Sequence, residues 1–324
     1  MPYDIEPRLL RAFVAVAEEL HFTRAAARLY VAQQALSRDI GRAERLLGTR
    51  LFLRTTRHVA LTADGERLLP HARRILAAYE RLAAACAGEP DRPLTVDVGG
   101  TMTTGHLVLA RARAAAPELE LVSRHGSGLT GAATAVAGGR LDVAFGRVAG
   151  LPAALRTGLG HLPVRLERMA VLLHEDHPLA ARASVPLDAL RGETLYAAAG
   201  NPATAEWTDL AERLFAGRGI ALAEPFPEIE GKEEFVRVVR RRGWSVLASE
   251  QFIEVPGMVL RPIAEPVPLS PVSLVWRAGL RHPGLDALRR AARELSTARA
   301  WLALPSTPWW LPAADAEAMG IPGS

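Results

Sequence analysis

Cysteine is almost absent from this chain of 324 residues, in which Cys86 is the only one. A single thiol excludes an internal disulfide framework and a zinc site built from several cysteines. No run of about 18 apolar residues occurs, so we expect no transmembrane helix. The N-terminus "MPYDIEPRLL" has acidic residues before any apolar stretch, unlike a secretory signal. We therefore expect a cytoplasmic protein.

Lysine is equally scarce. Because Lys232 is the only lysine, arginine is the chain's general basic residue, and only the position of the positive charge is informative. The net charge is +4 overall, yet residues 91–324 balance at zero and residues 23–60 alone carry +6. A basic patch confined to one small region indicates a polyanionic partner for that region.

A catalytic or metal-binding constellation is also lacking. The motif "HEDH" at 174–177 precedes Pro178 and has the character of a turn, and the remaining histidines are scattered. No serine–histidine–aspartate order or cysteine–histidine pairing is arguable, so we expect no enzymatic activity, no cofactor and no metal. The length and the 49% hydrophobic content indicate a globular protein of two or three domains.

The first sixty residues have the pattern of three short helices. An apolar stripe predicts the first from about residue 7 to 20. In "HFTRAAARLY", Thr23 is placed to cap the second, whose core side we expect to be Ala26, Ala27 and Leu29. The third follows in "VAQQALSRDIGRAERLLG" and closes on a glycine, which suits a left-handed C-terminal position.

The third helix has two contrasting faces. Its apolar face has the spacing of a core-facing stripe and consists of Leu36, Ile40, Ala43 and Leu47. Its other face offers amides, a hydroxyl and guanidinium groups, which bind base edges and phosphates. That face consists of Gln33, Gln34, Ser37, Arg38, Gly41, Arg42 and Arg45. For this helix taken alone, an ordinary solvated polar face is the alternative.

An extended pair follows in "TRLFLRTTRHVALT". We expect Leu51 and Phe52 to point inward, arginines and threonines to form a basic tip, and Val59 and Leu61 to lie on the returning strand. Three short helices and a basic hairpin predict a winged helix-turn-helix, with the third helix in the DNA-reading position.

At this point the sequence resembles the LysR-type transcriptional regulators. The resemblance runs without interruption over about residues 7–69, through "LLRAFVAVAEELHFTRAAARLYVAQQALSRDIGRAERLLGTRLFLRTTRHVALTADGERLL". Two positions depart from the family: Ala32-Gln33-Gln34 stands where Ser-Gln-Pro is common, and Gly41 replaces a larger residue. The resemblance implies that the following residues face DNA: Thr23, Arg24, Gln33, Gln34, Ser37 and Arg38, with Arg54, Thr55 and Arg57 on the wing.

These residues divide by role. Glutamine suits adenine and arginine suits guanine, so the base-edge candidates are Gln33, Gln34, Ser37 and Arg38. The candidates for phosphate or minor-groove contacts, which position the protein, are Thr23, Arg24, Arg42, Arg54 and Arg57. The alternative for some arginines is a surface ion pair, such as Arg42 with Asp39.

We expect a DNA-binding domain at 1–65 and a linker helix at 66–88. Apolar residues recur in this helix at spacings of four and three, a heptad seam typical of paired helices: Leu68, Ala72, Ile75, Tyr79, Leu82 and Cys86. Packing against the chain's own effector domain is the alternative. A dimer through this helix places two reading helices on one duplex and implies a partly palindromic operator.

Strands and helices alternate beyond the linker, the pattern of an α/β fold. The resemblance implies a two-lobed effector domain at 92–300, like a periplasmic binding protein, with a small molecule between the lobes. We place lobe I at about 92–162 and 267–300, and lobe II at about 163–266. The expected fold is thus α/β with an N-terminal all-α winged helix-turn-helix domain and a long linker helix.

The candidate effector site begins in "VDVGGTMTTGH", where a strand leads through glycines into a helix. Backbone N–H groups and hydroxyls at a helix N-terminus bind anions such as carboxylates, although a glycine turn capped by threonine is the alternative. A carboxylate from lobe II would instead favour a cationic or hydroxyl-bearing effector, so the effector's charge stays open. The candidates are Gly100, Thr101, Met102, Thr103 and Arg147 from lobe I, and Asn201, Pro202, Thr204 and Glu230 from lobe II.

The segment 301–324 holds Trp301, Trp309 and Trp310, and its prolines prevent a continuous helix. We expect these rings to lie on the chain's own surface; contact with another subunit is the alternative. The whole sequence predicts a ligand-responsive, sequence-specific regulator that binds double-stranded DNA as a dimer or tetramer, with RNA polymerase as a further candidate partner. The rivals are a solute-binding or enzymatic α/β protein and an architectural DNA binder.

Overall fold

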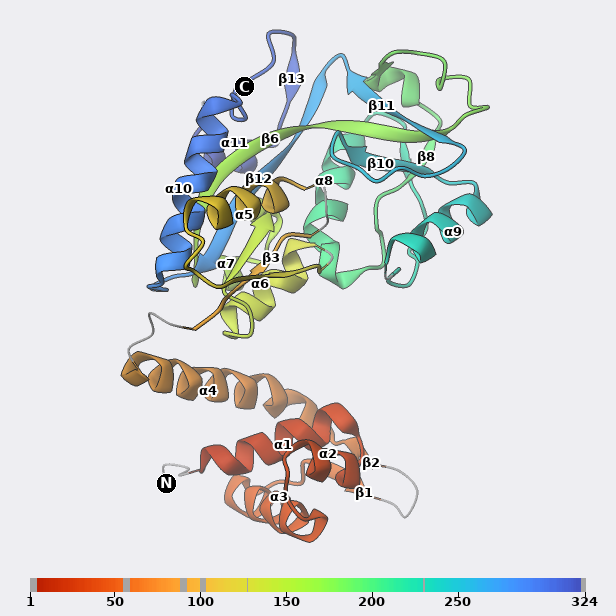
Figure 1. Cartoon of the computed structure of the whole chain (residues 1–324). Coiled ribbons are helices and arrows are strands. Elements are labelled where there is room, and N and C mark those ends of the chain that lie inside the picture. Colours follow the sequence, from red (N-terminus) through yellow and green to blue (C-terminus); the bar gives the residue numbers. More distant parts are fainter. Residues whose placement is uncertain are drawn as a thin grey trace. The chain divides into compact units, whose positions relative to one another are not determined.

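The computed structural model describes residues 5–54, 59–87, 92–99, 103–126, 128–229 and 231–321, apart from the side chains of Arg54, Ala77 and 80–87. The chain divides into two compact units, residues 1–89 and 90–324, which are described separately (Figure 1). Within the described parts of the chain, no helix is both long enough and apolar enough to cross a membrane.

The first unit contains the predicted helices and hairpin. Its elements are α1 (Pro7–Glu19), α2 (Phe22–Arg28), α3 (Gln33–Leu47), β1 (Phe52–Arg54), β2 (Val59–Leu61) and α4 (Ala63–Ala87). The two strands pair antiparallel, with Phe52 opposite Leu61. Gly48 ends α3 at φ 67°, the left-handed conformation that its position predicts.

The core of this unit lies between α1, α3 and the hairpin. Phe52 meets the ring of Phe13 edge to face, with 5.7 Å between the ring centroids. The predicted apolar stripe of α3 is confirmed, because Leu36, Ile40 and Ala43 are buried and Leu47 packs against the same core. In α2 the prediction was partly wrong. Ala26 is buried and Leu29 packs against the core as expected, but Ala25 is buried in place of Ala27, which is exposed.

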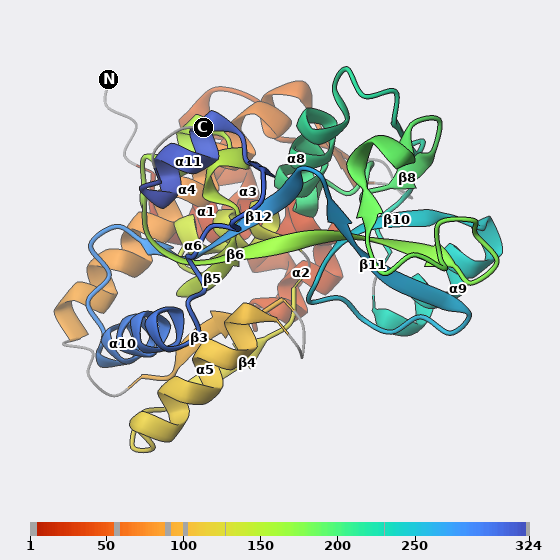
Figure 2. The ribbon, with the colours of Figure 1, turned by 90° about the horizontal axis from the view of Figure 1, so that it is seen from above.

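The second unit is built on one sheet, whose eleven strands lie among the described residues. Its main order is β4-β3-β5-β12-β6-β10-β8-β9, while β7, β11 and β13 pair beside this path. The strand β6 (Leu159–His174) crosses from one lobe to the other, and its first half pairs antiparallel with β12 (Val267–Arg277) (Figure 2). The lobe boundary expected near residue 163 therefore falls inside the continuous strand β6, and the one near 266 immediately precedes β12.

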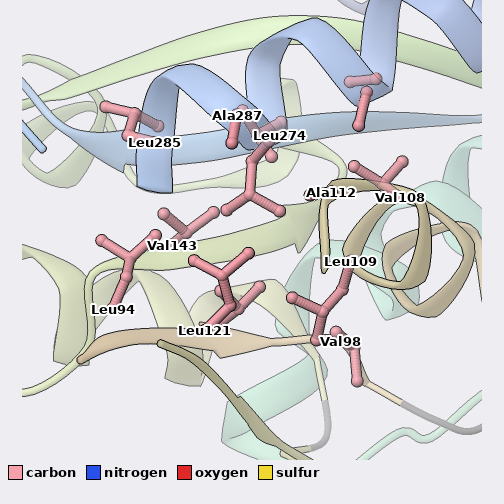
Figure 3. Packing of buried hydrophobic residues seen from close by; sticks show 14 of the residues in the cluster. Leu94, Val98, Val108, Leu109, Ala112, Leu121, Val143, Leu274, Leu285 and Ala287 are labelled. Carbon is pink, nitrogen blue, oxygen red and sulfur yellow. The ribbon is translucent and has the colours of Figure 1, made fainter. Parts of the chain in front are cut away.

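Lobe I has a parallel core, as the alternating pattern predicts. Both β3–β4 and β3–β5 pairs are parallel, whereas β12 runs antiparallel to β5. The helices α5 and α10 cover this sheet, and their leucines and alanines interlock with its valines (Figure 3). The elements are β3 (Leu94–Asp97), α5 (Thr104–Ala115), β4 (Leu121–Arg124), α6 (Leu129–Ala137), β5 (Val143–Gly146), η1 (Val148–Gly150), α7 (Ala153–Arg156) and α10 (Pro283–Ala298).

Lobe II extends the same sheet beyond β6. Its strand β10 pairs antiparallel with β6 and parallel with β8. A second apolar core forms around Met169, Leu195 and Leu214. The elements are β7 (Val185–Pro186), η2 (Leu187–Leu190), β8 (Thr194–Tyr196), η3 (Pro202–Thr204), α8 (Ala205–Phe215), β9 (Ala221–Leu222), α9 (Lys232–Arg242), β10 (Ser245–Ser249) and β11 (Met258–Ala264).

The C-terminal segment returns to the sheet. Its short strand β13 (Trp309–Trp310) pairs parallel with the start of β12, and the helix α11 (Ala313–Met319) follows. Trp301 is buried in the core of lobe I, and Trp309 packs against an apolar cluster that includes Leu311 and Met319. The prediction that these rings lie on the chain's own surface is therefore confirmed.

Candidate functional site

The reading motif begins at the turn between α1 and α2. The ring of His21 accepts hydrogen bonds from the N–H groups of Thr23 (3.2 Å) and Arg24 (3.4 Å), so His21 caps α2 and the prediction that Thr23 does so was wrong. The hydroxyl of Thr23 is exposed and donates to the side-chain oxygen of Gln33 at 3.4 Å. The structure thus brings together Thr23 and the first residue of α3, ten positions apart.

The polar face of α3 is presented to solvent. Gln33, Gln34, Arg38 and Arg42 are exposed, and Ser37 is half-buried. Ala32, the N-cap residue of α3, makes no side-chain hydrogen bond to the first N–H groups of the helix. A shallow hollow of about 540 Å³ lies on this face and is lined by Gln34, Ser37, Arg38, Asp39, Gly41, Arg42 and Arg45.

The arginines of this unit differ in their ion pairs. Arg42 contacts Glu6 at 2.8 Å and not Asp39, whose carboxylate pairs with Arg8 at 3.1 Å. Arg24 donates to the backbone oxygen of Glu19 at 2.6 Å. Among the described residues, Arg38 has no ion-pair partner. Exposed ion pairs contribute only about 0–1 kcal/mol to stability, so these contacts hold Arg24 and Arg42 only weakly.

The three predicted wing residues lie at or beyond the edge of the part of the hairpin that the structure describes. Thr55 and Arg57 lie outside the described residues. Arg54 ends β1, but its side chain is not described. Their role on the wing therefore stays a prediction.

The predicted seam of α4 divides into two parts. Leu68 packs against the core of the first unit and Ala72 is buried in it, so the beginning of the seam serves the unit's own fold and the prediction was wrong there. Ile75 and Tyr79, one and two turns later, are 41% and 43% exposed. The side chains of Leu82 and Cys86 lie outside the described part of α4.

In lobe I, the turn before α5 is held by its own hydrogen bonds. The hydroxyl of Thr103 accepts from the N–H of His106 at 3.3 Å and donates to the carbonyl of Val98, so Thr103 is the cap that the alternative interpretation expected. Gly100, Thr101 and Met102 lie outside the described residues. Their contact with an effector stays a prediction.

Sequence reasoning missed a buried carboxyl group between the lobes. Glu167 lies on β6, where it accepts a 2.7 Å hydrogen bond from the hydroxyl of Thr104 at the start of α5. Burial raises the pKa of Glu167, although hydrogen bonds from Thr104 and Ser249 oppose this effect. A single glutamate in an otherwise apolar strand, "LERMAVLL", is the signal that pointed to it.

The predicted lobe II residues lie at the contact between the two lobes. Asn201 is buried and its side chain accepts from the N–H of Ala203 at 2.8 Å, which caps η3. A Cβ atom on Gly128 would lie 2.3 Å from the carbonyl oxygen of Ala203 and 2.5 Å from Thr204, so only glycine permits this approach. Pro202 is exposed beside this contact, and Glu230 lies outside the described residues.

A second interlobe contact is made by Glu206, which sequence reasoning also missed. Its carboxylate accepts from the N–H groups of Leu129 (2.6 Å) and Thr130 (3.0 Å) at the start of α6. It also accepts from the Thr130 hydroxyl at 2.5 Å. A carboxylate of lobe II thus caps a helix of lobe I.

Arg147 occupies a different place from the one predicted. Its guanidinium group is buried, binds both carboxylate oxygens of Asp315 (2.8 to 3.0 Å) and contacts Asp209 at 2.6 Å. It also donates to the backbone oxygen of Glu206 at 2.7 Å. Arg147 therefore joins lobe I, lobe II and α11 in one network, and its donors are engaged within the chain and not directed at an effector.

An open groove of about 370 Å³ lies between the lobes near these contacts. Its walls combine carboxylates with a guanidinium group and an imidazole, and it is lined by Asp97, Arg124, His125, Gly126, Gly131, Ala132, Ala135, Leu141, Ala203 and Glu228. Among the predicted effector residues that the structure describes, Thr103, Arg147, Asn201, Pro202 and Thr204 do not line it, although Ala203 lies between Pro202 and Thr204 in the sequence. Polar residues at the ends of two adjacent strands, "LTVD" and "LVSRH", were the available signal.

Comparison with known families agrees with this architecture. Residues 7–66 match the family described as "Bacterial regulatory helix-turn-helix protein, lysR family", and residues 87–297 match the "LysR substrate binding domain". The chain belongs to the LysR family. It is a ligand-responsive transcriptional regulator, with an N-terminal DNA-binding domain and a domain that binds a small-molecule effector.

Similar LysR-family proteins span nearly the whole chain. The regulator XapR of Escherichia coli (strain K12) is 31% identical over 290 residues, which cover 82% of this chain and 90% of XapR. The uncharacterized regulator YnfL of the same organism is 33% identical over 84% of this chain and 92% of its own length. The crystal structure of CbnR, a LysR family transcriptional regulator, shares the fold with a TM-score of 0.63 at 24% identity, covering 89% of this chain and 98% of CbnR.

Proposed function

We propose that this LysR-family regulator reads its operator with the polar face of α3. The observation that carries the proposal is the division of one helix into two faces. Leu36, Ile40 and Ala43 are buried, while Gln33, Gln34 and Arg38 project into solvent. Planar amide and guanidinium groups form bidentate hydrogen bonds with base edges in the major groove. An α-helix with this face exposed is able to enter that groove.

The contacts divide into reading and positioning groups. Gln33, Gln34, Ser37 and Arg38 read bases. Thr23 at the start of α2 positions α3, since its hydroxyl contacts Gln33, and Arg24 and Arg42 contact phosphates. Arg54, Thr55 and Arg57 extend the same interface along the wing. We place the chain in the cytoplasm, because that compartment holds the DNA it binds. We propose that it acts by binding DNA and an effector, and not by catalysis.

The proposed DNA-binding form is a dimer through the second half of α4. Ile75 and Tyr79 support it, because two large apolar side chains one turn apart are about two-fifths exposed in the isolated chain. Their spacing of four continues the heptad pattern into the following turns. A symmetric dimer presents two copies of α3 and selects a partly palindromic operator. A tetramer and a contact with RNA polymerase would build on this dimer.

The proposed effector site is the groove between the lobes. A groove of about 370 Å³ is of the size that small organic molecules occupy in proteins. Asp97 at the end of β3 accepts from the N–H groups of Gly99 (2.8 Å) and Gly126 (3.0 Å), which fixes its carboxylate at the groove. Asp97, Glu228, Arg124 and His125 all line the groove, which therefore suits a small polar molecule that carries both donor and acceptor groups.

Fluorescence anisotropy tests the DNA-reading proposal. Two duplexes of equal length are compared at near-physiological salt, one from upstream of the protein's own gene and one scrambled. A preference of about a thousandfold or more is expected. Arg38→Ala should weaken specific binding about 5- to 150-fold more than nonspecific binding, the range for one bidentate base contact. Equal losses on both duplexes would make Arg38 a phosphate contact, and equal, strongly salt-dependent wild-type binding would refute the proposal.

The same assay tests the groove. Small carboxylates, amines and amino acids are screened for a change in operator affinity. Ala135→Phe, which fills the groove from α6, should abolish the response to any active compound and leave operator affinity without that compound unchanged. Glu317→Ala, on the exposed side of α11, is the control. A response that persists in Ala135→Phe places the effector elsewhere.

A further inference from the structure

Gly41 is an unusual residue for its position. It is the ninth of the fifteen residues of α3, and glycine destabilises a helix interior more than any residue except proline. The backbone gives no reason for it, because Gly41 is not among the residues with positive φ, where glycine is favoured. Any helix-forming residue would satisfy the backbone at this point.

Packing within the unit gives no reason for glycine either. A Cβ atom built on Gly41 would meet one described atom within 4 Å, the guanidinium nitrogen Nη1 of Arg45, at 3.6 Å. That distance is an ordinary van der Waals contact at the mobile end of a long side chain. A larger side chain therefore fits at this position in the isolated protein. Glycine therefore lowers the stability of α3 at a position where neither the backbone nor the packing requires it.

Gly41 lies on the polar face of α3, among the residues proposed to contact DNA. A residue in an α-helix is neighboured on the surface by those three and four positions away. For Gly41 these include Ser37 and Arg38 on one side and Arg45 on the other. Gly41 lines the hollow of about 540 Å³ on this face together with these neighbours, Arg42 and Gln34. Asp39 also lines the hollow, but its carboxylate is paired with Arg8 at 3.1 Å.

We propose that Gly41 determines DNA specificity because, having no side chain, it lets the helix backbone approach the base pairs closely. The bare helix backbone lets α3 sit deep in the major groove, with base-pair edges filling the hollow and Arg38, Arg42 and Arg45 around them. A side chain at this position holds the helix away from the bases and weakens contacts to neighbouring base edges. This inference rests on the proposed function of α3 as the reading helix.

Two substitutions of graded size test the inference in the full-length chain. Gly41→Ala adds one methyl group and Gly41→Gln adds a neutral side chain as long as those of Gln33 and Gln34. Both should unfold at a temperature no lower than the wild type, because each improves helix propensity without a clash. On the duplex that the wild type prefers, Gly41→Gln should raise Kd at least tenfold and Gly41→Ala by a smaller factor. Binding to the scrambled duplex should change by less than twofold.

Leu46→Gln is the matched control. It places the same side chain on the same helix, at a position 38% exposed and about 140° around the helix from Gly41. Its Kd should stay within twofold of the wild type. The inference is overturned if Gly41→Gln keeps wild-type affinity for the preferred duplex, or if Gly41→Ala lowers the melting temperature. A wild-type chain that binds both duplexes equally would refute the proposed function itself, and this inference with it.

Discussion

Glu167 illustrates how a single carboxyl group couples the effector domain to pH. It is 7% exposed on the strand that both lobes share, and its nearest hydrogen-bond donor is the hydroxyl of Thr104. Burial raises its pKa, so the folded protein favours the protonated form more than the unfolded chain does. The stability that Glu167 contributes is therefore full at low pH and is lost as the pH rises through the folded-state pKa.

Glu167→Gln should reveal this dependence. The amide is neutral at every pH and its oxygen still accepts from Thr104. The variant and the wild type should be about equally stable near pH 4, and the variant should gain about 1.4 kcal/mol for each pH unit between the unfolded-state and folded-state pKa values. Urea unfolding from pH 4 to pH 8 measures the difference, with the exposed Glu175→Gln as control. A difference that does not change with pH would show that Glu167 has the same pKa in the folded protein as in the unfolded chain.

At the scale of the element, the two halves of α4 have different surroundings. Its first half closes the core of the DNA-binding unit, where Ala72 is 4% exposed and Arg73 pairs with Glu18 of α1 at 2.9 Å. Its second half exposes Ile75 and Tyr79. In the proposed dimer, this exposed pair would pack against a partner helix, while the first half of α4 stays anchored to the DNA-binding unit.

Ile75→Glu should weaken the proposed dimer. A buried, unpaired carboxylate in a helix pair costs several kcal/mol, so the variant should be a monomer at concentrations at which the wild type is a dimer. Sedimentation velocity measures the mass, and far-ultraviolet circular dichroism checks the fold. Arg74→Glu, about 120° around the helix from the Ile75–Tyr79 stripe, should leave the mass unchanged. A dimeric Ile75→Glu would place the interface on another element.

The elements that the sequence predicted well have a signal contained within one segment. The buried face of α3 follows from the spacing of Leu36, Ile40 and Ala43, and its end follows from Gly48. The errors arose where a neighbouring residue competed for the same role. His21 caps α2 two residues before Thr23, because an imidazole nitrogen accepts from the same N–H groups as a hydroxyl. Ala72 has heptad spacing but faces α1, since periodicity does not say which partner a stripe meets.

The interlobe contacts were beyond sequence reasoning for a different reason. Arg147 meets Asp315 across 168 positions and Glu206 meets Leu129 across 77, so no local pattern connects them. A strand-end arginine points equally well to a ligand or to a buried carboxylate from elsewhere in the chain. The residues that line the interlobe groove were missed for the same reason, because only the fold brings Asp97 and Glu228 together.

At the scale of the whole effector domain, three distant segments meet at Arg147. Its guanidinium group is 5% exposed and takes Asp315 from α11, Asp209 from α8 and a backbone oxygen of the same helix. A buried cation is tolerated only while its partners are present. The contact between the lobes therefore depends on α11 in the C-terminal segment, which supplies Asp315.

Asp315→Ala should destabilise the effector domain by about 3–5 kcal/mol, because it leaves the guanidinium of Arg147 buried without its bidentate partner. Urea unfolding followed by tryptophan fluorescence measures the loss, and Glu317→Ala on the exposed side of the same helix is the control. The double variant Arg147→Met with Asp315→Ala should recover part of the loss, since it removes the buried charge. Equal stability of Asp315→Ala and Glu317→Ala would show that the ion pair contributes nothing.

The order of the two units along the chain has a consequence for synthesis. Among the side chains that the structure describes, the core of the DNA-binding unit uses none beyond Leu76, whereas the central sheet of the effector domain is incomplete until β12 ends at Arg277, about 200 residues later. At roughly 5–20 residues per second, a ribosome takes about 10–40 s to cover that distance. During this interval each nascent chain carries a finished DNA-binding unit with no effector domain to govern it. The first unit is therefore complete in sequence and able to fold well before the effector domain can.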